Sequence, residues 1–322
     1  MSLSVQKFGG SSVSDAKKLL HVAHIIKTAY DEGNRVIVVL SAQGDTTDHL
    51  LRAAHEISDD PSKRELDALL ATGEQASVAL CAMALEHLGV PAVSLSAWQV
   101  QILTEGSHGE ADIAKIAHAR IKRELDAGKV VLVAGFQGLN GNGDVTTLGR
   151  GGSDLSAVAL AASFHADICQ IYTDVDGIYT TDPRLCPTAH RLARVSFDDM
   201  LVLAENGAQV LHDKSVALAR KYGVNLEVRS CSGNGSGSIV CAEAPACGVT
   251  GVTQRVSGEL AGITAVGEDL PSIDAERSCI EALEKREITV CAVEEGKRYL
   301  TVFVHQQDAD RALCIVHDTL LN

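Results

Sequence analysis

Short runs of apolar residues alternate along the first half of the chain with longer segments whose apolar residues recur at helical spacing. The short runs predict strands at residues 3–7, 35–40, 129–134 and 168–173. The longer segments predict helices at residues 13–29, 73–88 and 154–163. Strands that are apolar throughout are typical of a sheet buried on both faces. The alternation therefore predicts an α/β fold with a parallel-rich central sheet between helical layers.

The pattern changes after a turn-rich Ser/Gly stretch at residues 232–237. We place a domain boundary just beyond it, giving domains 1–243 and 244–322. The second domain is predicted to contain strands at 260–266, 288–293 and 299–305, helices at 273–285 and 308–320, and a turn at 294–297. This order predicts a small ferredoxin-like unit. At roughly 70 residues such a unit is too small for a robust core, so we expect it to pair with a second copy.

Two glycine-rich loops carry the strongest chemical signal. Residues 7–12 read Lys-Phe-Gly-Gly-Ser-Ser, and residues 146–154 read Thr-Thr-Leu-Gly-Arg-Gly-Gly-Ser-Asp. Each follows a predicted strand and opens a predicted helix, which points backbone N–H groups at an anion. Neither loop fits the P-loop or the dinucleotide fingerprint. One such loop alone would be read as a tight turn, whereas two charged ones indicate phosphoryl transfer.

Composition narrows the possible partners. The chain has 42 acidic and 28 basic residues and a net charge of −14, which argues against nucleic acid and anionic membranes. A nucleotide complexed with magnesium is a better fit than a bare anion to the negative electrostatic field of such a protein. The nine cysteines form no C-x-x-C pair, and we find no signal peptide and no 18-residue apolar stretch. We therefore expect reduced, mostly buried thiols in a cytoplasmic protein.

The histidines give no sign of a metal site. His21 and His24 share one helical segment, but no carboxylate or cysteine stands at a zinc-ligand spacing from them. We expect surface histidines and predict no metal ligands.

Six segments together resemble the aspartate kinases of the amino acid kinase superfamily. They are residues 7–12, 41–47, 72–74, 134–138, 146–154 and 172–184. They stand in that family's order over roughly the first 240 residues, and the related carbamate, acetylglutamate and uridylate kinases lack the set. The tail resembles an ACT domain, the amino-acid-sensing module of this family. The resemblance implies an amino acid kinase fold followed by one small ACT-like domain.

The resemblance also implies a reaction. ATP, with Mg²⁺, would phosphorylate the β-carboxylate of L-aspartate to give 4-phospho-L-aspartate, the first step toward lysine and threonine. A carboxylate with a pKa of about 4 is ionised at neutral pH, so no general base is needed. Catalysis should then rest on positioning and electrostatics.

Four side chains are assigned to the reaction and its substrate. Lys7 is the candidate for stabilising charge on the transferring phosphoryl group. Asp154 would orient Lys7 or a magnesium-bound water, although it can also be a simple helix N-terminal charge. Arg150 has the planar fork that grips a carboxylate, here the α-carboxylate. Glu74 is placed in the first turn of an apolar helix, where it would bind the substrate ammonium or form a structural salt bridge.

Further residues complete the predicted site. Ser41 and Thr47 supply hydroxyls near the substrate and the phosphate. The nucleotide is assigned to Gly9, Gly10, Ser11, Thr173, Asp174, Tyr179 and Arg184. Gln209 stands where the family commonly has a lysine near the phosphates, so either Lys214 compensates or ATP binds more weakly.

The short tail has room for one ACT unit where the family usually has two. We therefore expect weak or no feedback by lysine and threonine, and a homodimer formed through the tail. Two alternatives remain open. One is the same chemistry on another amino acid carboxylate in a specialised pathway, and the other is a non-catalytic, amino-acid-sensing regulatory subunit.

Overall fold

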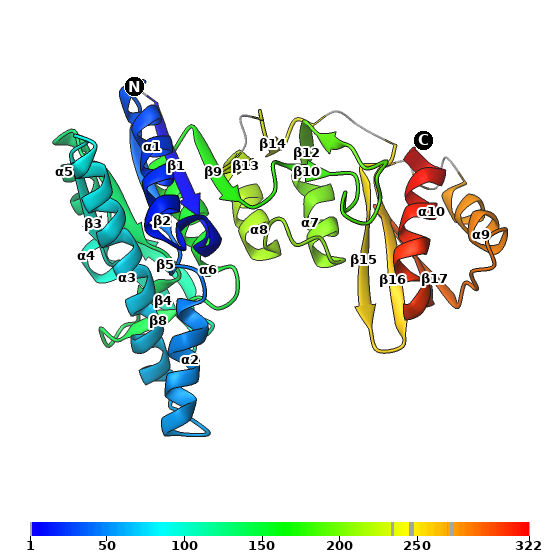
Figure 1. Cartoon of the computed structure of the whole chain (residues 1–322), viewed down its shortest axis with the longest axis horizontal. Coiled ribbons are helices and arrows are strands. Elements are labelled where there is room, and N and C mark those ends of the chain that lie inside the picture. The colour runs from blue at the N-terminus through cyan, green and yellow to red at the C-terminus, as the bar shows by residue number, and fades with distance from the viewer. Residues whose placement is uncertain (1, 233–234, 245–247, 269, 271–273, 322) are drawn as a thin grey trace. The chain divides into compact units, whose positions relative to one another are not determined.

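The computed structural model describes residues 2–232, 235–244, 248–268, 270 and 274–321 (Figure 1). The chain divides into two compact units. The first comprises Met1–Asp176 and Leu218–Ser236, and the second comprises Gly177–Ala217 and Gly237–Asn322. The predicted boundary between residues 243 and 244 falls beside residues 245–247, which lie outside the described residues, and it stays a prediction.

A parallel sheet forms the centre of the first unit, in the order β13-β9-β1-β2-β6-β3. Its strands are β1 Leu3–Phe8, β2 Arg35–Leu40, β3 Ala92–Leu95, β6 Val130–Ala134, β9 Ile168–Thr173 and β13 Leu226–Ser230. All residues of β6 are buried, as are all but the first of β2. The predicted parallel α/β architecture is therefore confirmed, and β2 and β9 have the predicted bounds.

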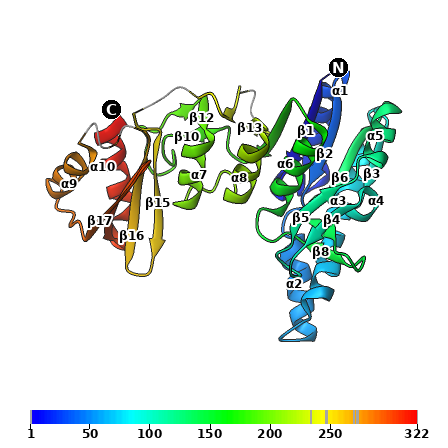
Figure 2. The ribbon, with the colours of Figure 1, turned by 180° about the vertical axis from the view of Figure 1, so that it is seen from behind.

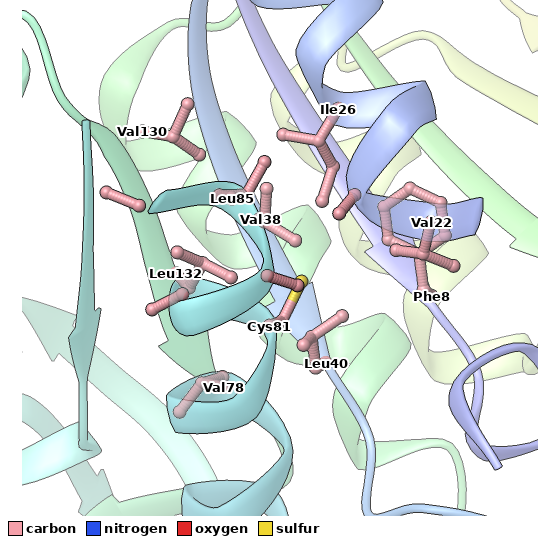
Figure 3. Close-up of a cluster of buried hydrophobic side chains, with 14 of the residues drawn as sticks. Phe8, Val22, Ile26, Val38, Leu40, Val78, Cys81, Leu85, Val130 and Leu132 are labelled. Atoms are coloured by element: carbon pink, nitrogen blue, oxygen red, sulfur yellow. The ribbon is translucent and has the colours of Figure 1, made fainter. Parts of the chain in front are cut away.

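Helices cover both faces of this sheet, which Figures 1 and 2 view from opposite sides. One face packs against α1 Ala16–Asp31 and α3 Lys63–His87. Figure 3 shows side chains of that interface, among them Ile26 and Leu85. The helix α6 Gly152–Phe164 packs against β1, β2 and β9. The remaining helices are α2 Thr46–Ile57, α4 Ala97–Val100 and α5 Ala119–Asp126.

The apolar helix α3 begins ten residues earlier than predicted, at Lys63 rather than residue 73. Ser62 caps it, since its side chain accepts a hydrogen bond from the Glu65 backbone. By length and composition alone α3 could cross a membrane, with a mean hydropathy of 1.4 over an 18-residue window, although Glu74 and Gln75 interrupt its apolar run. However, 56% of that window is buried within the protein, as in a core helix.

A second, smaller sheet of the first unit was not predicted. It has the order β5-β4-β7-β8. Its strands are β4 Ile102–Glu105, β5 Asp112–Ile116, β7 Gln137–Leu139 and β8 Val145–Thr147. The glycine-rich loop that leads into α6 follows β8 directly, so this sheet positions one wall of the site.

The second unit combines short strands with a four-stranded antiparallel sheet of order β15-β16-β18-β17. Helices α9 and α10 pack against one another beside that sheet, whose core includes Ile263, Val302 and Leu313. The elements are α7 Phe197–Glu205, α9 Ala275–Glu284, α10 Ala309–Leu321, β10 Ile178–Tyr179, β11 Arg191–Leu192, β12 Arg194–Ser196, β14 Ser238–Cys241, β15 Gly251–Ser257, β16 Leu260–Val266, β17 Ala292–Gly296 and β18 Tyr299–His305. Helix α8 Asp213–Tyr222 begins in the second unit and ends in the first, since the division falls between Ala217 and Leu218. The predicted ferredoxin-like order is present, with β15 as an added edge strand.

One strand of this sheet was misplaced by the sequence pattern. Residues 288–293 form a mostly apolar run, which predicted a strand. Ile288 is indeed buried, with 1% exposed, but it is not in a strand. In the structure Ile288 fills the core from the connection after α9, and β17 runs from Ala292 through Gly296, where a turn was predicted. The turn instead lies between Gly296 and Tyr299.

The cysteines of the described chain are free thiols. Most are buried, as expected, namely Cys81, Cys169, Cys186, Cys241 and Cys279.

Candidate active site

A cleft of about 340 Å³ opens in the first unit, beside the ends of β1, β2 and β6 and the loop before α6. Open parallel sheets place ligands at this edge. Seven of the predicted site residues line it, namely Lys7, Gly10, Ser41, Thr47, Glu74, Arg150 and Asp154. Both glycine-rich loops therefore contribute to a single cleft, although they are far apart in the sequence.

Lys7 and Asp154 form an ion pair in this cleft. Lys7 Nζ lies 2.6 Å from Asp154 Oδ1, and their side chains are 12% and 14% exposed. Lys7 comes from β1 and Asp154 from the first turn of α6, so two rigid elements fix the pair. Of the roles considered for Asp154, this geometry supports orienting the Lys7 ammonium.

Glu74 lies in the middle of α3, not in its first turn as predicted, and is 3% exposed. Its Oε1 accepts a hydrogen bond from the Ala42 N–H at 3.0 Å. Its Oε2 is buried and has no hydrogen-bond partner among the described residues. Burial raises the pKa of Glu74 to about 7. No described basic residue pairs with it, so the structural salt bridge is not present here.

The segment after β2 packs tightly between the first glycine-rich loop and α3. A Cβ on Gly10 would lie 2.5 Å from the Ala42 carbonyl oxygen, and one on Gly73 would lie 2.8 Å from Ala42 Cβ. Gly44 N–H donates to Gly10 O at 3.0 Å. Gly10 and Gly73 are thus required for the close approach of the segment around Ala42, and this packing brings Ser41 and Thr47 to the cleft.

Arg150 sits on an exposed loop that lines the cleft. The flanking Gly149 and Gly151 have φ values of 74° and 72°, a region that glycine adopts without strain. No described acidic side chain pairs with the Arg150 guanidinium. Its donors are therefore available to a ligand.

Asp67 is a residue of this region that the sequence analysis did not identify. It is 2% exposed, on α3, and accepts hydrogen bonds from Thr147 Oγ1 at 2.6 Å and from Gly109 N–H at 3.0 Å. His108 Nδ1 also lies 2.8 Å from Asp67 Oδ2. Asp67 therefore ties α3 to the base of the Arg150 loop. The sequence signal that could have identified Asp67 is a carboxylate inside a predominantly apolar helix. It was missed because the predicted helix began at residue 73, after Asp67.

The predicted nucleotide residues fall in both units. Thr173 ends β9 and Asp174 follows it, and β9 pairs with β1, so both residues come at the end of β1 where the first glycine-rich loop begins. Thr173 Oγ1 donates to Asp174 Oδ1 at 3.0 Å. In the loop itself, Gly9 O accepts from Ser12 N–H at 3.0 Å, and Ser11 O accepts from Lys18 Nζ at 3.1 Å. Gly9 and Ser11 are not among the residues that line the cleft.

The other two nucleotide residues, Tyr179 and Arg184, belong to the second unit. Arg184 NH2 donates to Asp182 Oδ2 at 2.7 Å within one turn. Gln209 and Lys214 also belong to the second unit. The nucleotide roles of all four stay predictions.

Comparisons with known proteins agree with this geometry. The amino acid kinase family profile matches residues 2–230. An aspartokinase from Geobacillus stearothermophilus is 53% identical over 240 residues, which cover 74% of this chain and 59% of that protein. Aspartokinase 2 from Bacillus subtilis (strain 168) is 42% identical over 99% of this chain and 79% of that protein.

A solved structure shares the whole fold. E. coli aspartokinase III, in complex with aspartate and ADP, gives a TM-score of 0.88 at 22% identity, over 99% of this chain and 100% of that chain.

Proposed function

Because this chain belongs to the amino acid kinase family, with aspartokinases among its relatives, we propose that it uses ATP to phosphorylate the β-carboxylate of L-aspartate. The chain spans 59% of the length of the Geobacillus relative, so this activity is inferred for the chain as it stands. The observation that carries the proposal is the unpartnered, buried Oε2 of Glu74 in the same cleft as Arg150 and the Lys7–Asp154 pair.

The substrate end of the cleft suits an amino acid. A carboxylate oxygen buried without a donor is costly, and a substrate ammonium supplies the missing donors. Arg150 binds the α-carboxylate with its guanidinium fork. Ser41 and Thr47 line the same cleft and would offer hydroxyls to the substrate and the phosphate.

At the phosphate end, Lys7 stabilises the charge that develops on the transferring phosphoryl group. Asp154 holds the ammonium of Lys7 in position at 2.6 Å. The β-carboxylate of aspartate is ionised at neutral pH and attacks directly, so no side chain has to remove a proton. When bound with ATP, Mg²⁺ neutralises charge on the phosphates.

Mg²⁺ enters with the nucleotide in this proposal. Of the carboxylates that line the cleft, Asp154 pairs with Lys7 and Glu74 accepts from Ala42 N–H. They do not present the set of open oxygen ligands that an all-protein site requires. Gly9, Gly10, Ser11, Thr173 and Asp174, at the ends of β1 and β9, would hold the nucleotide phosphates.

The proposal also covers the role of the second unit, the location of the enzyme and its pathway. The four-stranded sheet with its two helices supports an ACT-like role and pairing across a homodimer. We expect a cytoplasmic enzyme at the head of the route to lysine and threonine. Initial rates at subsaturating aspartate, measured against lysine and threonine singly and together, test the weak feedback expected from the tail.

The test of the activity is a hydroxamate assay with ATP, Mg²⁺ and a panel of amino acids. The proposal predicts an acyl hydroxamate with L-aspartate and little with L-glutamate. A strong signal with a different amino acid would favour a specialised kinase, and no signal with any would favour the regulatory subunit.

A further inference from the structure

Apart from the cleft, the described residues of the second unit contain a cluster of side chains of the types that bind metals. Cys186 lies between β10 and β11, and His317 and Asp318 lie on α10. The Cys186 Sγ, His317 Nδ1 and an Asp318 carboxylate oxygen all lie within 4.8 Å of one another. Cys186 is more than 130 residues from the adjacent His317 and Asp318, so no spacing pattern in the sequence indicates the cluster.

The distances among the three atoms are those of a metal site. Cys186 Sγ is 3.6 Å from His317 Nδ1 and 4.0 Å from Asp318 Oδ1, and the latter two are 3.2 Å apart. A tetrahedral zinc ion, with bonds of about 2.0–2.3 Å, separates its ligand atoms by about 3.3–3.6 Å. The cluster is therefore within a few tenths of an ångström of that arrangement.

Thr188 lies beside the three ligand atoms. Its Oγ1 is 3.1 Å from Cys186 Sγ and 3.3 Å from His317 Nδ1, and it donates a hydrogen bond to Asp318 Oδ1 at 2.5 Å. Thr188 thereby orients the Asp318 carboxylate, and a water can complete four-fold coordination.

The surroundings of His317 fit a ligand. Its side chain is fully buried, and its Nε2 lies 2.9 Å from Thr180 Oγ1. Ligating histidines donate the N–H of their other nitrogen to such a group, which fixes the ring and the tautomer. In the tautomer with the proton on Nε2, Nδ1 directs a lone pair toward Asp318 Oδ1 at 3.2 Å, where a cation between the two atoms would bind both.

We propose that Cys186, His317 and Asp318 bind a Zn²⁺-class divalent ion that joins the segment before β11 to α10. A thiolate, an imidazole and a carboxylate together select zinc over magnesium or calcium, which prefer oxygen ligands alone. The Asp318 side chain is 48% exposed, which gives the ion a path to the two buried ligands. The proposed site differs from the sequence prediction of no metal ligands, and the fully buried His317 departs from the expectation of surface histidines.

The expected consequence is stability of the second unit, not chemistry. An ion that binds the folded chain alone raises its melting temperature in proportion to the logarithm of the free ion concentration. The site lies outside the residues assigned to the reaction, so its failure would leave the proposed kinase activity untouched.

The test uses the full chain, stripped with a chelator and titrated with Co²⁺ and then Zn²⁺. We expect one bound Co²⁺, a sulfur-to-cobalt charge-transfer band that Zn²⁺ abolishes, and a higher melting temperature with Zn²⁺. Cys186→Ser should remove the band and weaken binding at least about tenfold. Asp318→Asn should weaken binding and keep the band. The matched control is Cys291→Ser, which changes an exposed thiol of the same unit and should match the unaltered chain.

Each contrary result overturns the proposal. These are the absence of a sulfur–cobalt band in the unaltered chain, equal binding by Cys186→Ser, or loss of the band in Cys291→Ser. If Cys186→Ser does not fold, as judged by circular dichroism, the spectrum of the unaltered chain and the affinity of Asp318→Asn decide the question. Unchanged affinity in Asp318→Asn then rejects the site.

Discussion

The two ends that we propose for the cleft, a phosphate end with Lys7 and Asp154 and a substrate end with Glu74 and Arg150, differ in how their charges are satisfied. At the phosphate end, Lys7 and Asp154 already pair at 2.6 Å. At the substrate end, Glu74 Oε2 has no partner among the described residues, and no described carboxylate pairs with Arg150. A pre-paired end is ready for charge that appears only during the reaction. An unpaired end is completed by a ligand that brings one positive and one negative group of its own.

The largest effect should follow from breaking the pre-paired end. Lys7→Ala should lower kcat by on the order of 100- to 1,000-fold, since it removes one transition-state donor, with little change in the aspartate KM. Steady-state kinetics measure both. The control is Lys27→Ala, a lysine of an exposed ion pair. A Lys7→Ala enzyme that keeps more than about a tenth of the kcat would remove Lys7 from this role.

At the substrate end, Arg150→Lys should raise the aspartate KM by about 10- to 100-fold, because the charge stays but the bidentate fork is lost. The ATP KM should stay nearly constant. Paired titrations of the two substrates separate these effects, with the exposed Arg64→Lys as control. An equal defect for ATP would assign Arg150 to the nucleotide.

The raised pKa of Glu74, about 7, predicts a pH dependence at the substrate end alone. Below that pKa the unliganded carboxyl is protonated, and the ammonium requires it ionised. The aspartate KM should therefore rise about tenfold per pH unit below about pH 7 and level off above it. Because the folded pKa is above the unfolded one, the stability of the unliganded protein should fall as pH rises from about 4.5 to about 7.

Measuring both profiles in Glu74→Gln tests this origin. The variant has no proton to lose, so its aspartate KM and its stability should be flat across the same window. A profile that survives the substitution would assign the titration to another group.

The smallest effect should come from the support beneath Arg150. The Asp67 carboxylate contacts Thr147, Gly109 N–H and His108. Asp67→Asn replaces one of its two acceptor oxygens by an amide NH₂, and it should raise the aspartate KM about three- to tenfold. The ATP KM and the pH profile should not move. Asp31→Asn, in an exposed ion pair, is the control. A change in kcat as large as that of Lys7→Ala would show that Asp67 does more than hold the loop.

The sequence pattern predicted β1, β2, β6 and β9 of the parallel sheet, because their apolar runs are long and local, but it did not predict β3 or β13. Strands β2, β9, β16 and β18 have their predicted bounds. Helix α3 was cut short because its charged first turns hid its apolar face, although Ser62 and Glu65 form a capping pattern that marks the true start. Asp67 was missed for the same reason.

Other features depend on contacts between distant segments, which no local pattern reveals. The hydrogen bond from Ala42 N–H to Glu74 Oε1 joins the segment after β2 to α3, 32 residues further along the chain. The Cys186–His317 contact joins positions 131 residues apart. The small sheet that carries the Arg150 loop consists of strands of three to five residues, too short for periodicity to distinguish.

The central claim is that the substrate completes the unpaired end of the cleft. The most direct test compares two substrates with the unaltered chain and two variants. L-aspartate and succinate, which lacks the ammonium, are compared as acceptors with the unaltered chain, Glu74→Gln and Arg150→Lys, by kcat/KM. We predict that Glu74→Gln loses at least about tenfold on aspartate and little on succinate, because only aspartate brings the ammonium that Glu74 binds. Arg150→Lys should lose on both. Equal penalties for Glu74→Gln on the two substrates would contradict the account.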